Sequence, residues 1–232
     1  MNTEDFANAT QEQPLIIETP FDIASIGFVK DEQSAKSFVM VTPKALGEMV
    51  AKDIHVFMQH GFAEGSQYSD LDYANEGVEF VDDFFQLANM SKALVKFQPF
   101  TFEEISIMKN GQIIFSSQDP NLVDMDYVQL ILGKKIAALA FNLIEDEKGK
   151  SMSERILTET LSETGINIAL SNFLLPYLTE LSEGARMRFV LQKNPSLMDS
   201  VYCFNGDVCN MDIADNLNLP YRDIVTLCWD LN

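Results

Sequence analysis

Short apolar runs alternate with short amphipathic segments along the first two thirds of the chain. The runs are strand-sized and apolar at successive positions, as strands that are buried on both faces require. Strands that alternate with helices indicate βαβ units and a mostly parallel sheet covered by helices on both sides. The predicted strands are Ile23–Val29, Ile54–Gln59, Val78–Val81, Ala93–Phe97, Ile113–Ser116 and Ile136–Ile144.

The segments between these runs carry helix start signals. Thr42 precedes Pro43, which is the pattern of an N-cap followed by proline at the first helical position. Thr101 precedes a pair of acidic residues, which the dipole of a helix favours in the first turn. The predicted helices are Thr42–Lys52, Ser69–Asn75, Asp82–Asn89, one that begins at Thr101, and Asn121–Leu132.

The stretch Lys150–Leu181 changes to a helical spacing of apolar residues. We interpret it as two helices, Ser151–Gly165 and Ile166–Leu181, that meet at Gly165. Proline within a helix removes one hydrogen bond, so Pro176 is expected to kink or restart the second helix.

The C-terminal part is predicted to contain a short helix, Arg186–Leu191, and a hairpin, Val201–Cys209. Asn205 and Gly206 supply the positive φ angles of a type I′ turn in that hairpin. A small helix, Asp212–Asn218, follows. The expected organisation is a flexible tail over residues 1–20, an α/β unit over 21–150, and a segment over 151–232 that completes the same domain.

The composition narrows the classes of function. The chain has 232 residues and a formal net charge of -19, which disfavours nucleic acid and anionic membrane as partners. No apolar run reaches the length of a membrane span, and the acidic N-terminus is not a signal or transit peptide. The three cysteines are an odd number, so free thiols of a cytoplasmic protein are expected rather than disulfides.

Few residues suggest chemistry. His55 lies inside a predicted strand and is interpreted as structural. His60 lies at the carboxyl end of that strand, where open α/β sheets bind ligands, so it is a candidate binding residue. Cys203 and Cys209 flank the hairpin without a basic neighbour, which favours inert thiols. No metal-ligand spacing and no nucleotide-binding glycine motif is present, so no metal and no cofactor is predicted.

Several motifs in order resemble one family. They are Val39-Met-Val-Thr-Pro43, Gly61-Phe-Ala-Glu-Gly65-Ser66, and Val95-Lys-Phe-Gln-Pro99 followed by Gly111-Gln-Ile-Ile-Phe115. The C-terminal half adds Ala169–Tyr177 and the hairpin region Val201–Tyr221. The chain resembles the catalytic domain of alanine dehydrogenase and of the alpha subunit of pyridine nucleotide transhydrogenase. This resemblance implies a flavodoxin-like three-layer α/β fold.

The chain departs from the family pattern at positions on which the activity of the family depends. The family inserts a nucleotide-binding domain between two helices that here nearly touch, so the resemblance implies no room for one. Phe38 stands where the family has a substrate-binding arginine, and Gln98 where it has its second lysine. Asp119 replaces the catalytic histidine, and a carboxylate there repels an oxoacid. Lys96 matches the first lysine of the motif.

The leading hypothesis is therefore a non-catalytic paralogue that acts in binding, assembly or regulation. We expect a homodimer or a complex with a full-length relative through the helices of Ser151–Leu181, whose apolar faces are expected to be exposed. One alternative is a sensor of amino acids or oxoacids near His60, Lys96, Gln98 and Asp119, unless Lys96 simply pairs with Asp119. The other is a residual NAD-linked oxidoreductase subunit that borrows a cofactor domain from a partner.

Overall fold

The computed structural model describes residues 24–31, 39–145, 163–182 and 187–229. The tail expected over residues 1–20 and most of the helix expected over Ser151–Gly165 lie outside these ranges. The described strands are β1 Ser25–Phe28, β2 His55–Gln59, β3 Glu79–Val81, β4 Ala93–Val95, β5 Ile113–Ser116, β6 Ala137–Ala140, β7 Val201–Phe204 and β8 Asp207–Val208.

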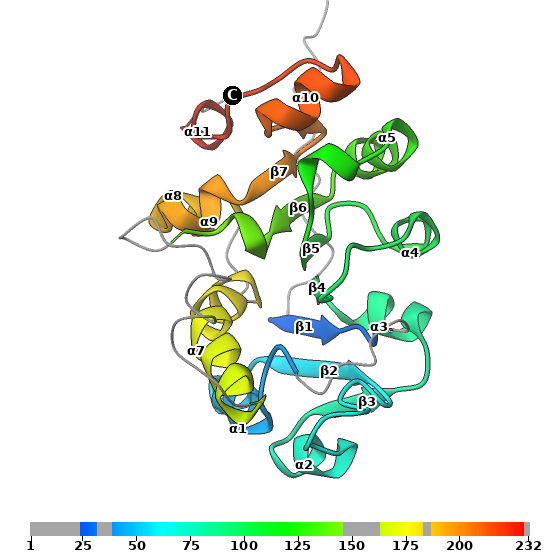
Figure 1. Cartoon of the computed structure of the whole chain (residues 1–232), viewed down its shortest axis with the longest axis vertical. Coiled ribbons are helices and arrows are strands. Elements are labelled where there is room, and N and C mark those ends of the chain that lie inside the picture. Colours follow the sequence, from blue (N-terminus) through cyan, green and yellow to red (C-terminus); the bar gives the residue numbers. More distant parts are fainter. Residues whose placement is uncertain (1–23, 32–38, 146–162, 183–186, 230–232) are drawn as a thin grey trace, which may run out of the picture.

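The described strands form one sheet of eight with the order β3-β2-β1-β4-β5-β6-β7-β8 (Figure 1). Strands β1 to β6 are parallel, whereas β7 and β8 are antiparallel to their neighbours. When the short edge strand β3 is set aside, the remaining parallel strands follow the flavodoxin order. The predicted α/β fold with a mostly parallel sheet, completed by a C-terminal hairpin, is therefore confirmed.

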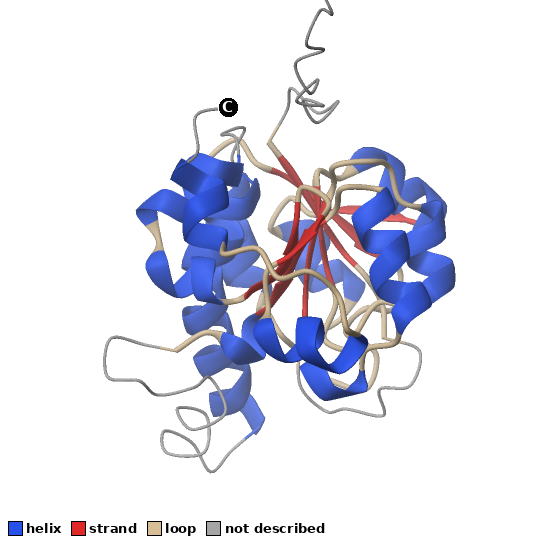
Figure 2. Ribbon diagram, turned by 90° about the horizontal axis from the view of Figure 1, so that it is seen from above, coloured by secondary structure: helices blue, strands red, loops and turns tan. Residues whose placement is uncertain are grey.

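Helices cover both faces of the sheet (Figure 2). One face carries α1 Pro43–Val50, α7 Glu163–Ser182, α8 Met187–Lys193, α9 Pro195–Asp199 and α11 Ile224–Trp229. The other carries α3 Phe84–Met90, α4 Phe102–Ile107, α5 Met125–Gly133 and α10 Met211–Leu217. Residues Ile113, Ile114 and Phe115 of β5 enter the two cores alternately, because successive side chains of a strand point to opposite faces.

Local capping signals place several helices where the sequence predicts them. The hydroxyl of Thr42 accepts a hydrogen bond from the backbone of Ala45 and caps α1. Thr101 and Glu104 form a reciprocal capping box at the start of α4. Ser69 caps α2 Asp70–Asn75 in the same way. In each case the side chain satisfies backbone donors that a helix leaves free at its first turn.

Several predicted elements are shorter than expected, and two of them change conformation within their predicted range. The strand predicted to reach Ile144 ends at Ala140 and continues as the 3-10 helix η2 Phe141–Leu143. Within η2, Asn142 exchanges two hydrogen bonds with the backbone of Gln118, which holds the chain in a turn. The helix predicted over Asn121–Leu132 divides into η1 Pro120–Leu122 and α5, because Asp124 caps a new helix.

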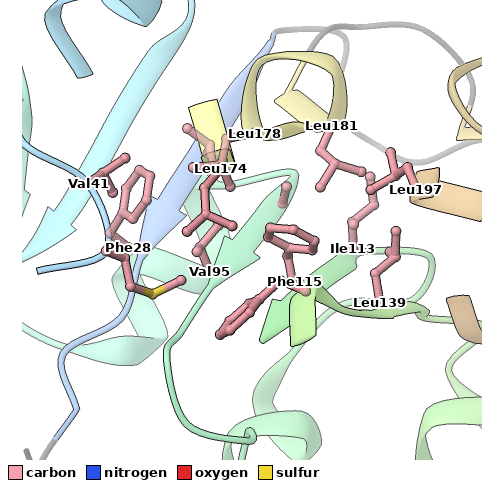
Figure 3. Packing of buried hydrophobic residues seen from close by; sticks show 14 of the residues in the cluster. Phe28, Val41, Val95, Ile113, Phe115, Leu139, Leu174, Leu178, Leu181 and Leu197 are labelled. Carbon is pink, nitrogen blue, oxygen red and sulfur yellow. The ribbon is translucent and has the colours of Figure 1, made fainter. Parts of the chain in front are cut away.

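The helix predicted over Ile166–Leu181 is observed as α7, but its predicted boundary at Gly165 is wrong. Helix α7 runs from Glu163 to Ser182 through both Gly165 and Pro176. Gly165 lies in its first turn, where few intrahelical bonds depend on it. Leu174, Leu178 and Leu181 are buried against the sheet, and this packing maintains the helix across the proline (Figure 3).

Helix α7 also contradicts the expectation of an exposed apolar face. Its apolar side chains enter the core between α7 and the sheet, and Ile168 is its exposed large apolar residue. Polar residues on α7 hold the chain segment before α1. The backbone of Val39 donates to Asn167 Oδ1 at 2.8 Å, and that of Thr42 donates to Ser171 Oγ at 2.7 Å.

The hairpin of β7 and β8 forms as predicted. Asn205 and Gly206 adopt φ angles of 52° and 93° between the two strands. The hairpin extends the edge of the sheet at β6, with Ala138 opposite Cys203. Residues far apart in the sequence thus complete one sheet.

Candidate functional site

The carboxyl ends of β1, β2, β4 and β5 lie along one edge of the sheet, because these strands are parallel. Between β1 and β4 the strand order changes direction, and open α/β sheets bind ligands at such a switch point. The residues that directly follow these strands define the candidate site. Those named from the sequence are His60, Lys96, Gln98 and Asp119.

His60 follows β2 and is held by residues of its own neighbourhood. Its Nδ1 lies 3.0 Å from Asp70 Oδ2, and its ring stacks on Phe80 with centroids 5.0 Å apart. Asp70 also accepts from the backbone N–H of Gly61. The exposed imidazole of His60 therefore contacts α2 and β3, and not Lys96 or Gln98 after β4.

The turn after His60 contains Gly61 and Gly65 and lies at the surface of the protein. Gly61 and Gly65 adopt φ angles of 75° and 87°, which favour glycine. Lys30, which follows β1, contacts Glu64 of this turn at 2.7 Å. The hydrogen bond and positive charge of Lys30 lower the pKa of the Glu64 carboxyl. The turn is thereby connected to the end of β1.

Lys96 does not pair with Asp119, so that expectation is wrong. Its Nζ contacts both carboxylate oxygens of Glu104 on α4, at 2.8 and 2.9 Å, and lies 5.9 Å from the centroid of the Phe100 ring. Lys96 follows Leu94 by two positions, so it shares the sheet face that α4 covers. The pair is largely buried, with side-chain exposures of 9% for Lys96 and 17% for Glu104.

Asp119 lies exposed at the start of η1 and has a local role. Its carboxylate accepts from the backbone and side-chain N–H groups of Asn121, at 2.9 and 3.1 Å. Gln98 is half-buried, and its backbone N–H donates to Asp31 Oδ1 at 3.3 Å, which links the segments after β1 and β4. Phe38 lies outside the described residues.

The structure does not bring the candidates together. Within the described ranges, no hydrogen bond or ion pair joins any two of His60, Lys96, Gln98 and Asp119. Glu104 contacts the candidate site through Lys96, and the sequence analysis did not predict this contact. Its capping box was recognised, but its second partner lies eight positions earlier, and no local pattern indicates that contact. The arrangement therefore provides a neutralised lysine at the sheet edge rather than a free cation.

Neither a cluster of metal-ligand side chains nor a membrane-spanning helix is found in the part of the chain that the structure describes. No group of three or more His, Cys, Asp or Glu side chains there could hold a metal ion. No described helix combines the length and the apolar composition needed to cross a membrane.

The cysteines are buried, and burial raises the pKa of each thiol. The pKa of Cys209 is raised to about 12, and those of Cys203 and Cys228 are also raised. Because only the thiolate is nucleophilic, we expect the native protein to react with a thiol-specific chromogenic disulfide at pH 8 far more slowly than the urea-unfolded chain. Absorbance measurements over time test this. Rapid reaction of any one thiol in the native state would contradict the prediction.

A sequence profile described as "Alanine dehydrogenase/PNT, N-terminal domain" matches residues 28–156. The chain belongs to this family. Curated relatives include alanine dehydrogenases of Methanococcus maripaludis, 23% identical over 52% of this chain, and of Mycolicibacterium smegmatis, 29% identical over 39%. A solved L-alanine dehydrogenase superposes with a TM-score of 0.50 and 18% identity, covering 58% of this chain and 36% of that structure.

The chain matches only part of these relatives. The alignments span 32% of the Methanococcus enzyme and 24% of the Mycolicibacterium enzyme. Only residues 157–162 separate the matched segment from α7, which is too few for a nucleotide-binding domain at that point. Two segments that resemble the family, Val39–Pro43 and the start of Ala169–Tyr177, meet through the hydrogen bond of Thr42 to Ser171.

Proposed function

We propose that this member of the alanine dehydrogenase/PNT N-terminal domain family is non-catalytic and acts as a binding or assembly protein. The observation that carries the proposal is the buried ion pair of Lys96 and Glu104. An oxoacid needs a cation for its carboxylate, and the lysine that matches the family motif already contacts both oxygens of an internal carboxylate. Freeing it would leave Glu104 without its partner.

The neighbouring positions support this proposal. Gln98, in place of the second lysine of the family motif, brings no charge. Asp119 adds an exposed carboxylate where the resemblance implies a histidine, and it caps η1. A substrate anion would therefore meet a neutral amide and a negative charge, without the general acid that reduction of a carbonyl requires.

A direct activity test addresses the non-catalytic role. We expect purified protein to show no oxidation of NADH with pyruvate and ammonium. We expect the same result after addition of a full-length alanine dehydrogenase whose own substrate site has been inactivated. An active alanine dehydrogenase is the positive control. Turnover that depends on this chain would overturn the proposal and support a residual oxidoreductase subunit.

Ligand binding is tested separately by thermal shift with amino acids and oxoacids. We expect no stabilisation by pyruvate or alanine, because Lys96 is neutralised within the protein. The variant Glu104→Gln is the informative comparison, since it removes the competing carboxylate. A reproducible rise in the melting temperature of the unaltered protein with any oxoacid would favour a sensor over a binding or assembly role.

The assembly part of the proposal is a homodimer or a complex with a full-length relative. Residues 151–162 of the segment first expected to form the contact lie outside the described ranges, and α7 buries its apolar side chains. Light scattering at micromolar concentration, with and without the relative, measures the assembly. Monomers under both conditions would contradict it.

A further inference from the structure

Strand β3 is the last strand on one side of the described sheet, and its one neighbouring strand there is β2. The N–H of His60 donates to the carbonyl of Val81 at 3.3 Å. In a parallel ladder, alternate residues of a strand turn both backbone groups toward the same neighbour. Glu79 and Val81 therefore bond to β2, whereas Phe80 between them turns its N–H and C=O away from the sheet. We call this outward backbone of β3 the β3 edge.

The β3 edge is held in an extended conformation by packed elements at both of its ends. The N–H of Val78, which precedes β3, donates to the carbonyl of Tyr73 on α2 at 3.2 Å. After β3, the side chain of Asp83 caps α3. Tyr73 is buried in the core on one face of the sheet, and Leu87 of α3 is buried on the other. An added strand therefore needs no rearrangement of the fold at this edge, which lies beside α2 at one end of the molecule (Figure 1).

The side chains around the β3 edge are acidic. The sequence has no lysine or arginine between Lys52 and Lys92. Helix α2, strand β3 and the residues that directly follow each of them carry six carboxylates, of which five belong to exposed residues and that of Asp70 to a half-buried one. The six are Asp70, Asp72, Glu76, Glu79, Asp82 and Asp83.

Charges on neighbouring elements do not balance these six carboxylates. Helix α1, which packs against α2, and the turn after it carry two exposed lysines and two exposed acids, so their net charge is zero. These residues are Lys44, Glu48, Lys52 and Asp53. Lys30 contacts Glu64. His55 contacts Glu79 and His60 contacts Asp70, so that with both imidazoles protonated four negative charges still remain.

This charge disfavours two occupants of the edge. A second copy that paired through its own β3 would place the same carboxylates against one another, and charged side chains at a sheet edge prevent self-association in this way. Residues 1–29 of this chain contain no lysine or arginine, so its own N-terminal segment is not complementary either. A strand with basic side chains satisfies both the open backbone and the charge.

We propose that the β3 edge binds a basic extended segment of another protein as an added strand. The backbone of that segment would exchange hydrogen bonds with the N–H and C=O of Phe80. Its lysine or arginine side chains would meet the carboxylates that flank β3. The inference concerns the edge of the sheet rather than the switch point between β1 and β4, and it does not depend on whether the chain has activity.

Three labelled synthetic peptides of equal length test the proposal. One alternates lysine with valine, the second has the same side chains on a fully N-methylated backbone, and the third has glutamate in place of lysine. We expect the first to bind in fluorescence anisotropy, to bind less tightly as salt is added, and to slow hydrogen exchange of the Phe80 amide measured by NMR. We expect the other two to bind at least about tenfold more weakly, because one lacks backbone donors and the other is repelled.

Two double variants show whether the charges at this edge matter. Glu79→Gln/Asp82→Asn should weaken binding of the lysine peptide by at least about threefold. Asp212→Asn/Asp215→Asn is the matched control, since it removes two exposed carboxylates on α10 at the other end of the molecule, and it should leave binding unchanged. The proposal is overturned by no binding of the lysine peptide, by equal binding of the N-methylated peptide, by unchanged exchange at Phe80, or by equal effects of the two double variants.

Discussion

Replacement of Leu174 by alanine is expected to lower the free energy of unfolding by about 2–5 kcal/mol. Leu174 is completely buried between α7 and the sheet, and Figure 3 shows it beside Val95 and Leu178. The change removes apolar contacts and leaves a cavity that close-packed neighbours fill only in part. Urea denaturation monitored by circular dichroism gives the difference in free energy.

The matched control for this prediction is Asn172→Ala, which changes an exposed position on the same helix. Its expected effect is within about 0.5 kcal/mol of the unaltered protein. The comparison separates the effect of lost packing against the sheet from the effect of placing alanine in α7. Equal and small losses for both variants would show that α7 does not pack against the sheet as described.

The second large effect is expected for Lys96→Met. This change leaves the Glu104 carboxylate in a largely buried place without its cation, and loss of one partner from a buried pair costs about 3 kcal/mol or more. Glu104 still accepts from the backbone N–H of Thr101 at 2.7 Å, which does not neutralise its charge. Urea denaturation at neutral pH again measures the loss.

Two further variants show whether the loss comes from the unpaired Glu104 carboxylate. Lys96→Met combined with Glu104→Gln should recover most of the loss, because no buried charge remains and the glutamine can still serve the capping box. Lys30→Met, which breaks the exposed contact with Glu64, should change stability little. If Lys96→Met were no more destabilising than Lys30→Met, the ion pair would not hold Lys96, and the main support for a non-catalytic role would be lost.

Elements with strong local signals were predicted closely. Strand β5 matches its predicted range, since its four apolar or small residues lie between turn residues and are buried on both faces. The caps at Thr42 and Thr101 and the turn at Asn205 and Gly206 are likewise determined by neighbouring residues. In each case the energy of the local hydrogen bonds or backbone conformation is sufficient to select the structure.

The site was less accessible to prediction from the sequence. The positions of His60, Lys96, Gln98 and Asp119 at the ends of strands follow from the βαβ pattern. Their partners do not, because Lys96 reaches α4 and His60 reaches α2 across loops whose shape depends on packing. The separation of these residues into independent contacts is therefore a result of the tertiary structure.

The sequence by itself determined the α/β class, the family resemblance and the changed residues at positions 38, 98 and 119. These depend on residue type, order and spacing, which are present before folding. Only the tertiary structure decided that α7 continues through Gly165 and Pro176, and that Glu104 neutralises Lys96. In both cases burial by distant segments overrides local preferences.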